Sequence, residues 1–325
     1  MSKLPIYAYA GISILISTVA LANQSPITGG PIGATDINNA FLPAQGEVFL
    51  GLTGLSAFSS RLVNNDYNYV PGSSHALLAA VYVGYVYPFS VLGGKLSSGL
   101  QEGYEADGRL MLPGLRDQTV VGWRDLYVDF ANWSRYVGPI FGESTAQHGG
   151  GPPVPYGLTV KFEYSMIFAI GQYNNGAPLS PSAGTTFFIP NAGATYLTQP
   201  DRLGGPFEVD LHFFYDARSE NPHNDYTNGS IVDLDYAAVQ RFHRYSFGIT
   251  GSYAVQVEDD LVGPYRHEQL VSPEGDHYGI FTLGPIFSAP IPFLNGSFKI
   301  KAPFAIRARN TLLLNTVVAN LLFQF

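Results

Sequence analysis

The residues of this 325-residue chain that could act chemically are charged side chains recurring at every second position of extended segments. Side chains on a strand point to opposite faces in turn, so this spacing gathers the charges on one face of each segment. If those faces surround a common interior, they form a charged lining. The candidate lumen and selectivity residues are Lys161, Glu163, Glu208, Asp210, His212, Asp216, Asp233, Asp235, Arg244, Lys299, Lys301, Arg307 and Arg309.

Opposite charges across a narrow lumen can act in two ways. Acidic residues such as Glu208 and Asp210 would form one wall, and basic residues such as Lys299 and Lys301 another. The two walls can pair and fill a small barrel with polar side chains. Alternatively, they can create a transverse field that orders water and sorts solutes by charge and dipole, as charged rings do in channels. The sequence leaves both interpretations open.

Neither metal binding nor catalysis has a clear signature in this sequence. The seven histidines are scattered and form no pair four residues apart, so we expect no metal site, and no cofactor is implied. Some membrane barrels hydrolyse lipids with a serine and a histidine, and Ser246 near His243 is the kind of pair such chemistry needs. No Gly-x-Ser-x-Gly motif accompanies it. We therefore expect a protein that is not an enzyme, and lipid hydrolysis is the least favoured alternative.

The elements that would position the charges are long strands. In residues 158–170, apolar side chains such as Phe162 alternate with polar ones such as Lys161. The same rule returns in three later segments, which are 207–218, 244–258 and 298–309. Soluble strands are usually about 5–6 residues long, whereas a tilted strand needs about 9–11 residues to cross the hydrocarbon of a membrane. The length favours a closed antiparallel transmembrane β-barrel of the all-β class over a soluble sandwich.

Twelve strands follow from this pattern, an even number as bacterial barrels require. Their approximate ranges are 46–58, 77–89, 91–101, 119–132, 157–171, 183–198, 205–218, 228–242, 244–258, 276–289, 294–308 and 311–325. Outward connections should be long and periplasmic turns short. The long ones would be 59–76, 102–118, 172–182, 219–227 and 259–275. The clearest short ones lie at 242–244 and around Ser90, while 133–156 departs from the rule as a misplaced strand or a periplasmic insertion.

The N-terminus predicts export. Residues 1–22 carry Lys3, an apolar run and Ala20-Leu21-Ala22, the pattern of a signal peptide cleaved after Ala22. The alternative is a permanent anchor helix, but no Lys or Arg follows the run to hold it. Residues 23–44 would then be a periplasmic or plug-like segment, and 45–325 the barrel domain.

Composition narrows the partners further. The net charge of −8 makes nucleic acid an unsuitable partner, and the absence of cysteine excludes disulfides. Aromatic side chains at predicted strand ends fit interfacial girdles, in which rings sit at the level of the lipid headgroups. They are Tyr87, Phe89, Phe242, Tyr245 and Phe293.

The last strand ends on an aromatic residue. Phe323 and Phe325 share the apolar face of residues 311–325, opposite Asn320 and Gln324. A terminal Phe on such a strand is typical of the assembly signal of outer-membrane barrels. We therefore expect outer-membrane lipid and the barrel-assembly machinery as partners, and the cell outer membrane of a Gram-negative bacterium as the location.

The C-terminal half resembles a known family, the meta-pathway phenol degradation proteins. The similar residues are Phe214-Tyr215-Asp216, Glu220-Asn221-Pro222, Asp225-Tyr226-Thr227-Asn228-Gly229, Leu234-Asp235-Tyr236-Ala237 and Arg309-Asn310-Thr311. Upstream, residues 123–127 leading to Trp133 are similar to that family's Gly-Asp-Leu strand, with Trp123-Arg124 in place of the usual small residues. Where the family tends to have Pro-Thr-Gly and a Tyr, residues 169–173 read Ala-Ile-Gly-Gln-Tyr. The resemblance covers about 45–325 and implies an outer-membrane channel loosely akin to fatty-acid and aromatic-hydrocarbon transporters.

The favoured function is an outer-membrane channel for passive uptake of small solutes, which the resemblance implies to be hydrophobic or aromatic. The main rival is a barrel anchor or adhesin whose loops bind outside ligands. A channel requires a permeable lumen and the rival a closed one, so measured permeability separates them.

Overall fold

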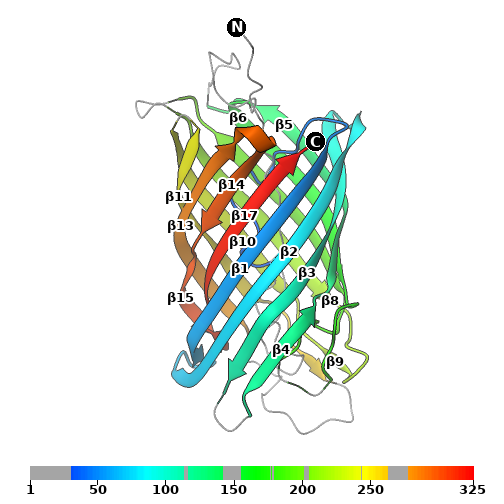
Figure 1. The fold of residues 1–325 in the computed structure, drawn as a ribbon, viewed down its shortest axis with the longest axis vertical. Coiled ribbons are helices and arrows are strands. Elements are labelled where there is room, and N and C mark those ends of the chain that lie inside the picture. Colours follow the sequence, from blue (N-terminus) through cyan, green and yellow to red (C-terminus); the bar gives the residue numbers. More distant parts are fainter. Residues whose placement is uncertain are drawn as a thin grey trace.

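The computed structural model describes residues 31–112, 116–141, 155–175, 177, 179–200, 205–242, 244–262 and 277–325. Over these residues the chain forms a closed antiparallel barrel of twelve strands, three of which are interrupted, as Figure 1 shows. The first six barrel strands are β1 (Val48–Val63), β2 (Tyr69–Val91), β3 (Gly94–Met111), β4 with β5 (Gln118–Trp123, Leu126–Gly138), β6 (Gly157–Phe168) and β7 (Phe187–Leu197). The other six are β8 (Phe207–Arg218), β10 (Ile231–Phe242), β11 (Tyr245–Gln256), β13 (Gly279–Ile291), β14 with β15 (Gly296–Lys301, Phe304–Arg309) and β16 with β17 (Thr311–Leu312, Asn315–Gln324).

Pairing of the first and last strands closes the barrel. β1 pairs with β17 from Phe49 opposite Gln324 to Phe58 opposite Asn315. The C-terminal Phe325 donates its amide hydrogen to the carbonyl of Val48 at 2.9 Å. Two short strands, β9 (Tyr226–Thr227) and β12 (Leu261–Val262), pair with each other apart from the barrel wall. Closure matters because a sheet edge exposed to lipid would leave backbone groups unpaired. The prediction of a closed barrel with about twelve strands is confirmed.

The two faces of the strands follow the predicted alternation. In β6, Thr159, Lys161 and Glu163 are buried inside the barrel, whereas Phe162 is 56% exposed on the outside. Apolar side chains therefore cover the outer surface, as a membrane requires. Among the described residues, no helix is long and apolar enough to cross a membrane.

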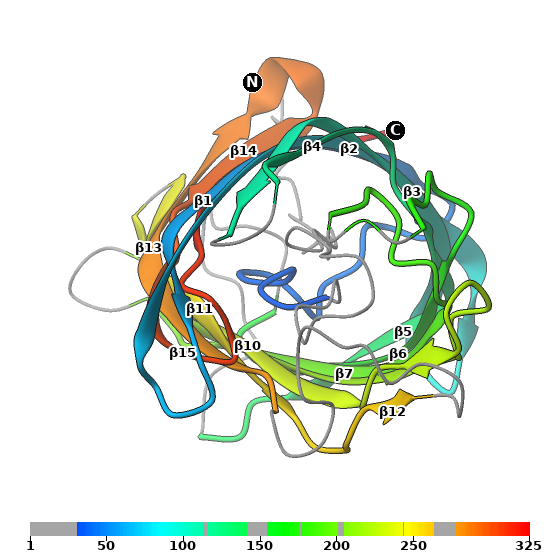
Figure 2. The ribbon, with the colours of Figure 1, turned by 90° about the horizontal axis from the view of Figure 1, so that it is seen from below.

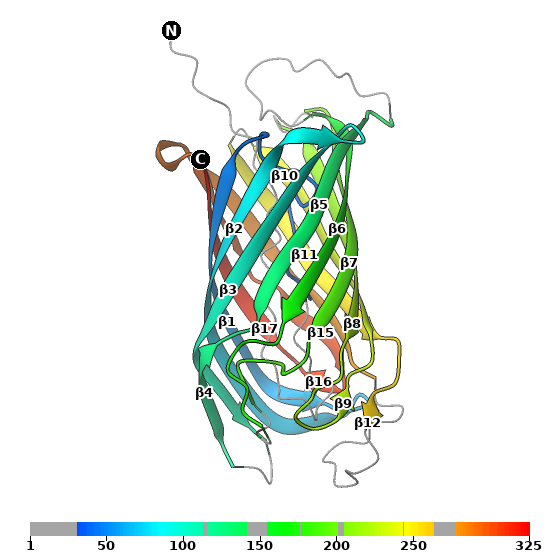
Figure 3. The same ribbon diagram turned by 90° about the vertical axis from the view of Figure 1, so that its right-hand side faces the viewer.

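The barrel ends differ in their connections. At the end that holds Phe325, the connections between β2 and β3 and between β13 and β14 are short, as Figures 1 and 3 show. Leu92 and Gly93 join β2 to β3 with φ of 49° and 73°, and positive φ at both central residues is the requirement of a tight type I′ hairpin. The five aromatic residues assigned to girdles all belong to this end, in or beside the turns that leave β2, β10 and β13.

Two predicted long loops were wrong. The expected loop 59–76 is mostly strand, because β1 and β2 remain paired as far as Val63 opposite Tyr69. The expected loop 102–118 is also mostly strand, because β3 continues to Met111 and pairs there with β2. The segment 133–156 begins as strand, in line with the misplaced-strand alternative, since β5 continues to Gly138. Residues 142–154 lie outside the described part.

Candidate channel lumen and its plug

Residues 31–44, which we call the plug, lie inside the barrel. Figure 2, a view along the barrel, shows this stretch as the blue loop within the ring of strands. Three apolar side chains anchor it to different parts of the wall. Ile32 packs with Tyr278 and Ile280, Ile37 with Val239 and Ile286, and Phe41 with Tyr156 and Leu197. The lumen is thus filled by a separate stretch of chain rather than by wall side chains alone.

The acidic wall holds the plug by its backbone. The Asp235 carboxylate accepts hydrogen bonds from the amides of Gly33 (2.8 Å) and Thr35 (2.7 Å). Further along, Glu208 accepts from the amide of Asn38 at 2.7 Å, and Asp210 from that of Asn39 at 3.2 Å. The plug has no regular secondary structure, so its buried amides need partners from elsewhere. The wall carboxylates supply them.

The basic wall holds the plug by charge. Asp36, on the plug, forms ion pairs with Lys299 and with Lys301, the latter at 2.8 Å. Lys301 also donates to the carbonyl of Gly33 at 2.8 Å. Burial acts to raise the pKa of Asp36, but the two ammonium groups more than offset it and leave the pKa below its ordinary value. Asp36 is therefore a carboxylate in the docked plug.

The plug also has contacts near its C-terminal end. Lys95 of β3 donates to the carbonyls of Leu42 at 3.0 Å and Pro43 at 2.8 Å. Ser134 of β5 donates to the carbonyl of Ala40. These contacts lie close to the short-turn end of the barrel, where the amide of Gly46 binds the carbonyl of Val86. The plug therefore enters the lumen from the end that holds the chain terminus Phe325.

A second polar cluster lines the wall on β5, β6 and β8. Lys161 and Glu163 form a fully buried ion pair of 2.5 Å. Beside it, the Tyr127 hydroxyl donates to Glu163 at 3.0 Å and contacts Asp129. His212 is also buried, with its Nε2 2.7 Å from the side-chain oxygen of Asn191. The charges are paired within the wall, which is the filled-barrel behaviour.

The last pair of acidic candidates lies on β8 and β10. Asp216 pairs with Arg218 at 2.9 Å, and the Arg218 guanidinium lies 4.5 Å from the centre of the Phe187 ring. Asp233 is fully buried, and its carboxylate oxygens have no hydrogen-bond partner among the described residues.

The predicted position in the lumen was wrong for three residues. Arg244 is exposed in the turn between β10 and β11. Arg307 and Arg309 point outward, in register with Phe281 and Gly279. A register irregularity in β15 near Ile306 inverts the faces, because one extra residue moves all later side chains to the other side.

Several residues that hold the plug were missing from the sequence prediction, Lys95 and Ser134 among them. Arg241 of β10 pairs with Glu208 and donates to the side-chain oxygen of Asn38 at 2.5 Å. It is separated from Asp233 and Asp235 by a multiple of two residues, so the alternation could have predicted that it faces the lumen. Asp36 had no such signal, since it lies in an irregular segment without periodicity.

Comparisons with known proteins identify a family and a barrel of similar fold. The model of the family described as putative MetA-pathway of phenol degradation matches residues 43–321. The structure is similar to that of the COG4313 outer membrane channel from Pseudomonas putida F1, with a TM-score of 0.67 and 11% sequence identity over 88% of this chain and 98% of that one. The transport unit of the autotransporter AIDA-I from Escherichia coli gives a TM-score of 0.49 and 13% identity over 87% and 90% of the two chains. No curated protein sequence matches.

Proposed function

We propose, from the premise that this chain belongs to the family described as putative MetA-pathway of phenol degradation, that it is an outer-membrane channel for passive uptake of small hydrophobic or aromatic compounds. On this proposal, the structure with the plug in the lumen is the closed state. The substrate class is inferred from the family description, and the route across the membrane is inferred from the barrel. The observation that carries the proposal is the way in which the plug is held.

The polar contacts of the plug are made with groups to which water can also bind. Its amides bind wall carboxylates such as Asp235 and Glu208, and its single acidic side chain, Asp36, binds two lysines. Each hydrogen bond to a charged group contributes only about 1.5–3 kcal/mol net, because water competes for both partners. A plug held in this way can leave and return, whereas a lumen filled by wall side chains cannot open without unfolding strands.

A short connection joins the C-terminal end of the plug to β1. Residues Ala44 to Glu47 connect it to β1 at the rim, where the Glu47 side chain accepts from the amide of Ala44 at 3.0 Å. Gln45 and Gly46 lie at the same rim. A short rim connection allows residues 31–43 to swing out toward the periplasm as one unit while the barrel stays intact.

Single-channel recording in planar bilayers tests the proposal. The refolded chain should show mainly closed traces with brief openings, and a variant lacking residues 31–41 should show a lasting increase in conductance. A matched deletion in the turn at 65–67 should behave like the parent chain. If neither the parent nor the plug deletion conducts, the barrel is a closed anchor or adhesin and the channel proposal is wrong.

Substrate class needs its own measurement. Cells whose outer membrane contains the protein should take up phenol faster than cells carrying an empty vector. Equal uptake in the two would contradict the assignment of aromatic cargo. If the conductance measurement were still positive, the channel would carry another class of solute.

We propose further that residues 1–22 direct export and are removed after Ala22, and that the barrel-assembly machinery inserts the chain into outer-membrane lipid. We also propose that the protein has no enzymatic activity and does not bind nucleic acid. Mass measurement of protein isolated from outer membranes tests the first point, because cleavage after Ala22 leaves Asn23 as the first residue.

A further inference from the structure

Two arginines of β15 point out of the barrel wall. Arg307 and Arg309 lie on either side of Ala308, which is 3% exposed and faces the interior opposite Ile280. Successive side chains of a strand point to opposite faces, so both guanidinium groups are on the membrane side. Short turns mark the periplasmic end of such barrels, and β15 lies in the half of the barrel away from that end, as Figure 1 shows. The two arginines therefore face the outer leaflet.

The turn between β1 and β2 lies against these arginines. Arg309 donates from Nε to the side-chain oxygen of Asn65 at 2.8 Å. The guanidinium of Arg307 lies 4.4 Å from the centre of the Tyr67 ring. A guanidinium stacked on an aromatic face keeps the N–H groups along its edge available to an anion. The turn thus orients both arginines without neutralising them, because asparagine and tyrosine are uncharged partners.

Arg61 of β1 adds a third guanidinium beside the same turn. It lies 4.9 Å from the centre of the Tyr69 ring, which is itself exposed. We call Arg61, Arg307 and Arg309 the arginine patch. Among the described residues, none of the three forms an ion pair with a carboxylate, although the exposed Asp66 belongs to the turn. The patch therefore keeps a net positive charge that can attract an anion from outside the chain.

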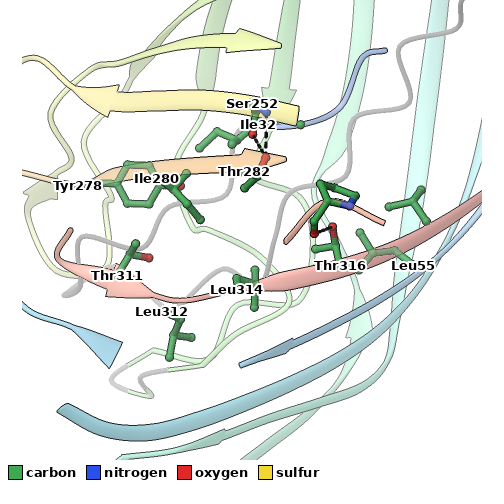
Figure 4. Close-up of a pocket in the computed structure, with 13 residues that line it drawn as sticks. Ile32, Leu55, Ser252, Tyr278, Ile280, Thr282, Thr311, Leu312, Leu314 and Thr316 are labelled. Atoms are coloured by element: carbon green, nitrogen blue, oxygen red, sulfur yellow. Dashed lines mark hydrogen bonds between the residues drawn. The ribbon is translucent and has the colours of Figure 1, made fainter. Parts of the chain in front are cut away.

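The inner side of this part of the wall is apolar. It holds a cavity of about 40 Å³ lined mostly by apolar side chains, among them Ile280, Leu312 and Leu314, as Figure 4 shows. Two hydroxyls that reach the cavity, those of Ser252 and Thr282, already bind each other at 2.9 Å. A guanidinium turned into this space would lose its hydration without gaining a counter-charge, which is costly. Packing inside the barrel therefore keeps the arginines on the outer surface.

A groove on the outer face extends the patch across β2 and β3. Pro71 of β2 is the register partner of Arg61, and the groove begins at Ser73, the next residue on that face. It has a volume of about 540 Å³ and contains a further arginine, Arg109. Arg109 forms an exposed ion pair with Asp107 at 2.9 Å. Such pairs contribute little stability, so an incoming anion can compete for Arg109. Hydroxyl and charged groups in an outer groove suit the sugar headgroup of a lipid.

Apolar side chains border the patch on the side of the membrane interior. Phe304 and Ile306 precede the two arginines of β15, and Phe58 precedes Arg61 on β1. All three are exposed on the outside of the barrel. Acyl chains can pack on these side chains. The outer face thus offers apolar contacts and cationic contacts next to each other, as one anionic lipid requires.

We propose that the arginine patch and the adjoining groove bind a phosphorylated glycolipid of the outer leaflet, of the lipid A type. Its phosphates bind Arg61, Arg307 and Arg309, its sugars lie in the groove, and its acyl chains lie on the apolar side chains. A guanidinium presents two parallel N–H groups to a phosphate, and such charge-assisted bonds are about twice as strong as neutral ones. The site is outside the barrel, so the inference does not depend on which solute the channel carries.

Native mass spectrometry of the refolded chain in detergent tests the proposal. The probe is diphosphorylated lipid A, titrated against the parent chain, with dephosphorylated lipid A and phosphatidylglycerol as comparison lipids. The variant Arg307→Gln with Arg309→Gln removes two guanidinium groups from the patch. The matched control is Arg135→Gln with Arg244→Gln, which removes the same charge from two exposed arginines near the short turns.

We expect the parent chain to bind diphosphorylated lipid A more tightly than either comparison lipid. The patch variant should bind it about tenfold more weakly or worse, because two charged contacts are lost, and the control variant should match the parent. Equal affinities of the parent and the patch variant would overturn the proposal, as would equal binding of the three lipids. Displacement of lipid A by an excess of inorganic phosphate would overturn the lipid as the ligand.

Folding of each variant is checked by the heat-dependent change in gel mobility of a closed barrel. If the patch variant does not fold, Arg61→Gln, on another strand, is measured against the parent instead. It should also weaken the binding of diphosphorylated lipid A, and an unchanged affinity in this variant would contradict the proposed site.

Discussion

Asp36 of the plug and Lys301 of β14 form an ion pair of 2.8 Å inside the barrel, although 265 positions separate them in the sequence, between residues 36 and 301. Lys299 binds the same carboxylate. The pair joins the plug to a strand of the barrel wall. On the proposed channel function, loss of this contact should favour the open state.

Replacing Asp36 should open the channel. In Asp36→Asn, both lysines lose their counter-charge inside the barrel, and removing one partner of a buried pair typically costs about 3–5 kcal/mol. Even half of that would shift the closed-to-open ratio by more than about tenfold. Single-channel open probability is the measurement. Asp66→Asn, in the exposed β1–β2 turn, is the matched control and should leave it unchanged.

Reversing the lysines should expel the plug through repulsion. In the double variant Lys299→Glu with Lys301→Glu, three carboxylates would face one another, so conductance should rise and selectivity should shift toward cations. Adding Asp36→Lys restores opposite charges and should close the channel again. Unchanged conductance and selectivity in the double variant would contradict the role of these lysines.

The wall charges were predictable because period-two alternation depends only on local geometry. Lys161 and Glu163 are inside the barrel, where the alternation of β6 placed them. Arg307 is outside, because the register irregularity of β15 depends on how the strand fits β13 and leaves no mark in the pattern of charges. The role of Asp36 could not be derived, since an irregular segment has no period and its position depends on the tertiary structure.

Acid should release the plug, because the pKa of Asp36 is lowered in the docked state. A carboxyl whose pKa is lowered on docking stabilises the docked state above its ordinary pKa, which is about 3.9 for aspartate, and that stabilisation is lost as the pH falls through the lowered value. The contribution of Asp36 to the stability of the closed state should thus stay constant from pH 7 to about pH 4 and decrease below that pH. The difference in open probability between the parent chain and Asp36→Asn measures this contribution. A difference that stays constant at pH values well below 4 would contradict it.

Two glycines on neighbouring strands should differ in their tolerance of a methyl group. A Cβ atom on Gly84 of β2 would lie 2.2 Å from Cζ of Phe49, whose ring is buried and stacked on Tyr82 with 5.6 Å between ring centres. Neither ring can move far, so Gly84→Ala should destabilise the barrel by about 1–3 kcal/mol through overpacking. Gly54 of β1 has nothing within 4 Å of the same position, so Gly54→Ala should leave stability almost unchanged. Urea unfolding of the refolded barrel, followed by tryptophan fluorescence, compares the two variants with the parent. Equal midpoints for Gly84→Ala and the parent would mean that the Phe49 ring shifts without cost, and that close packing of this ring does not limit the stability of the barrel.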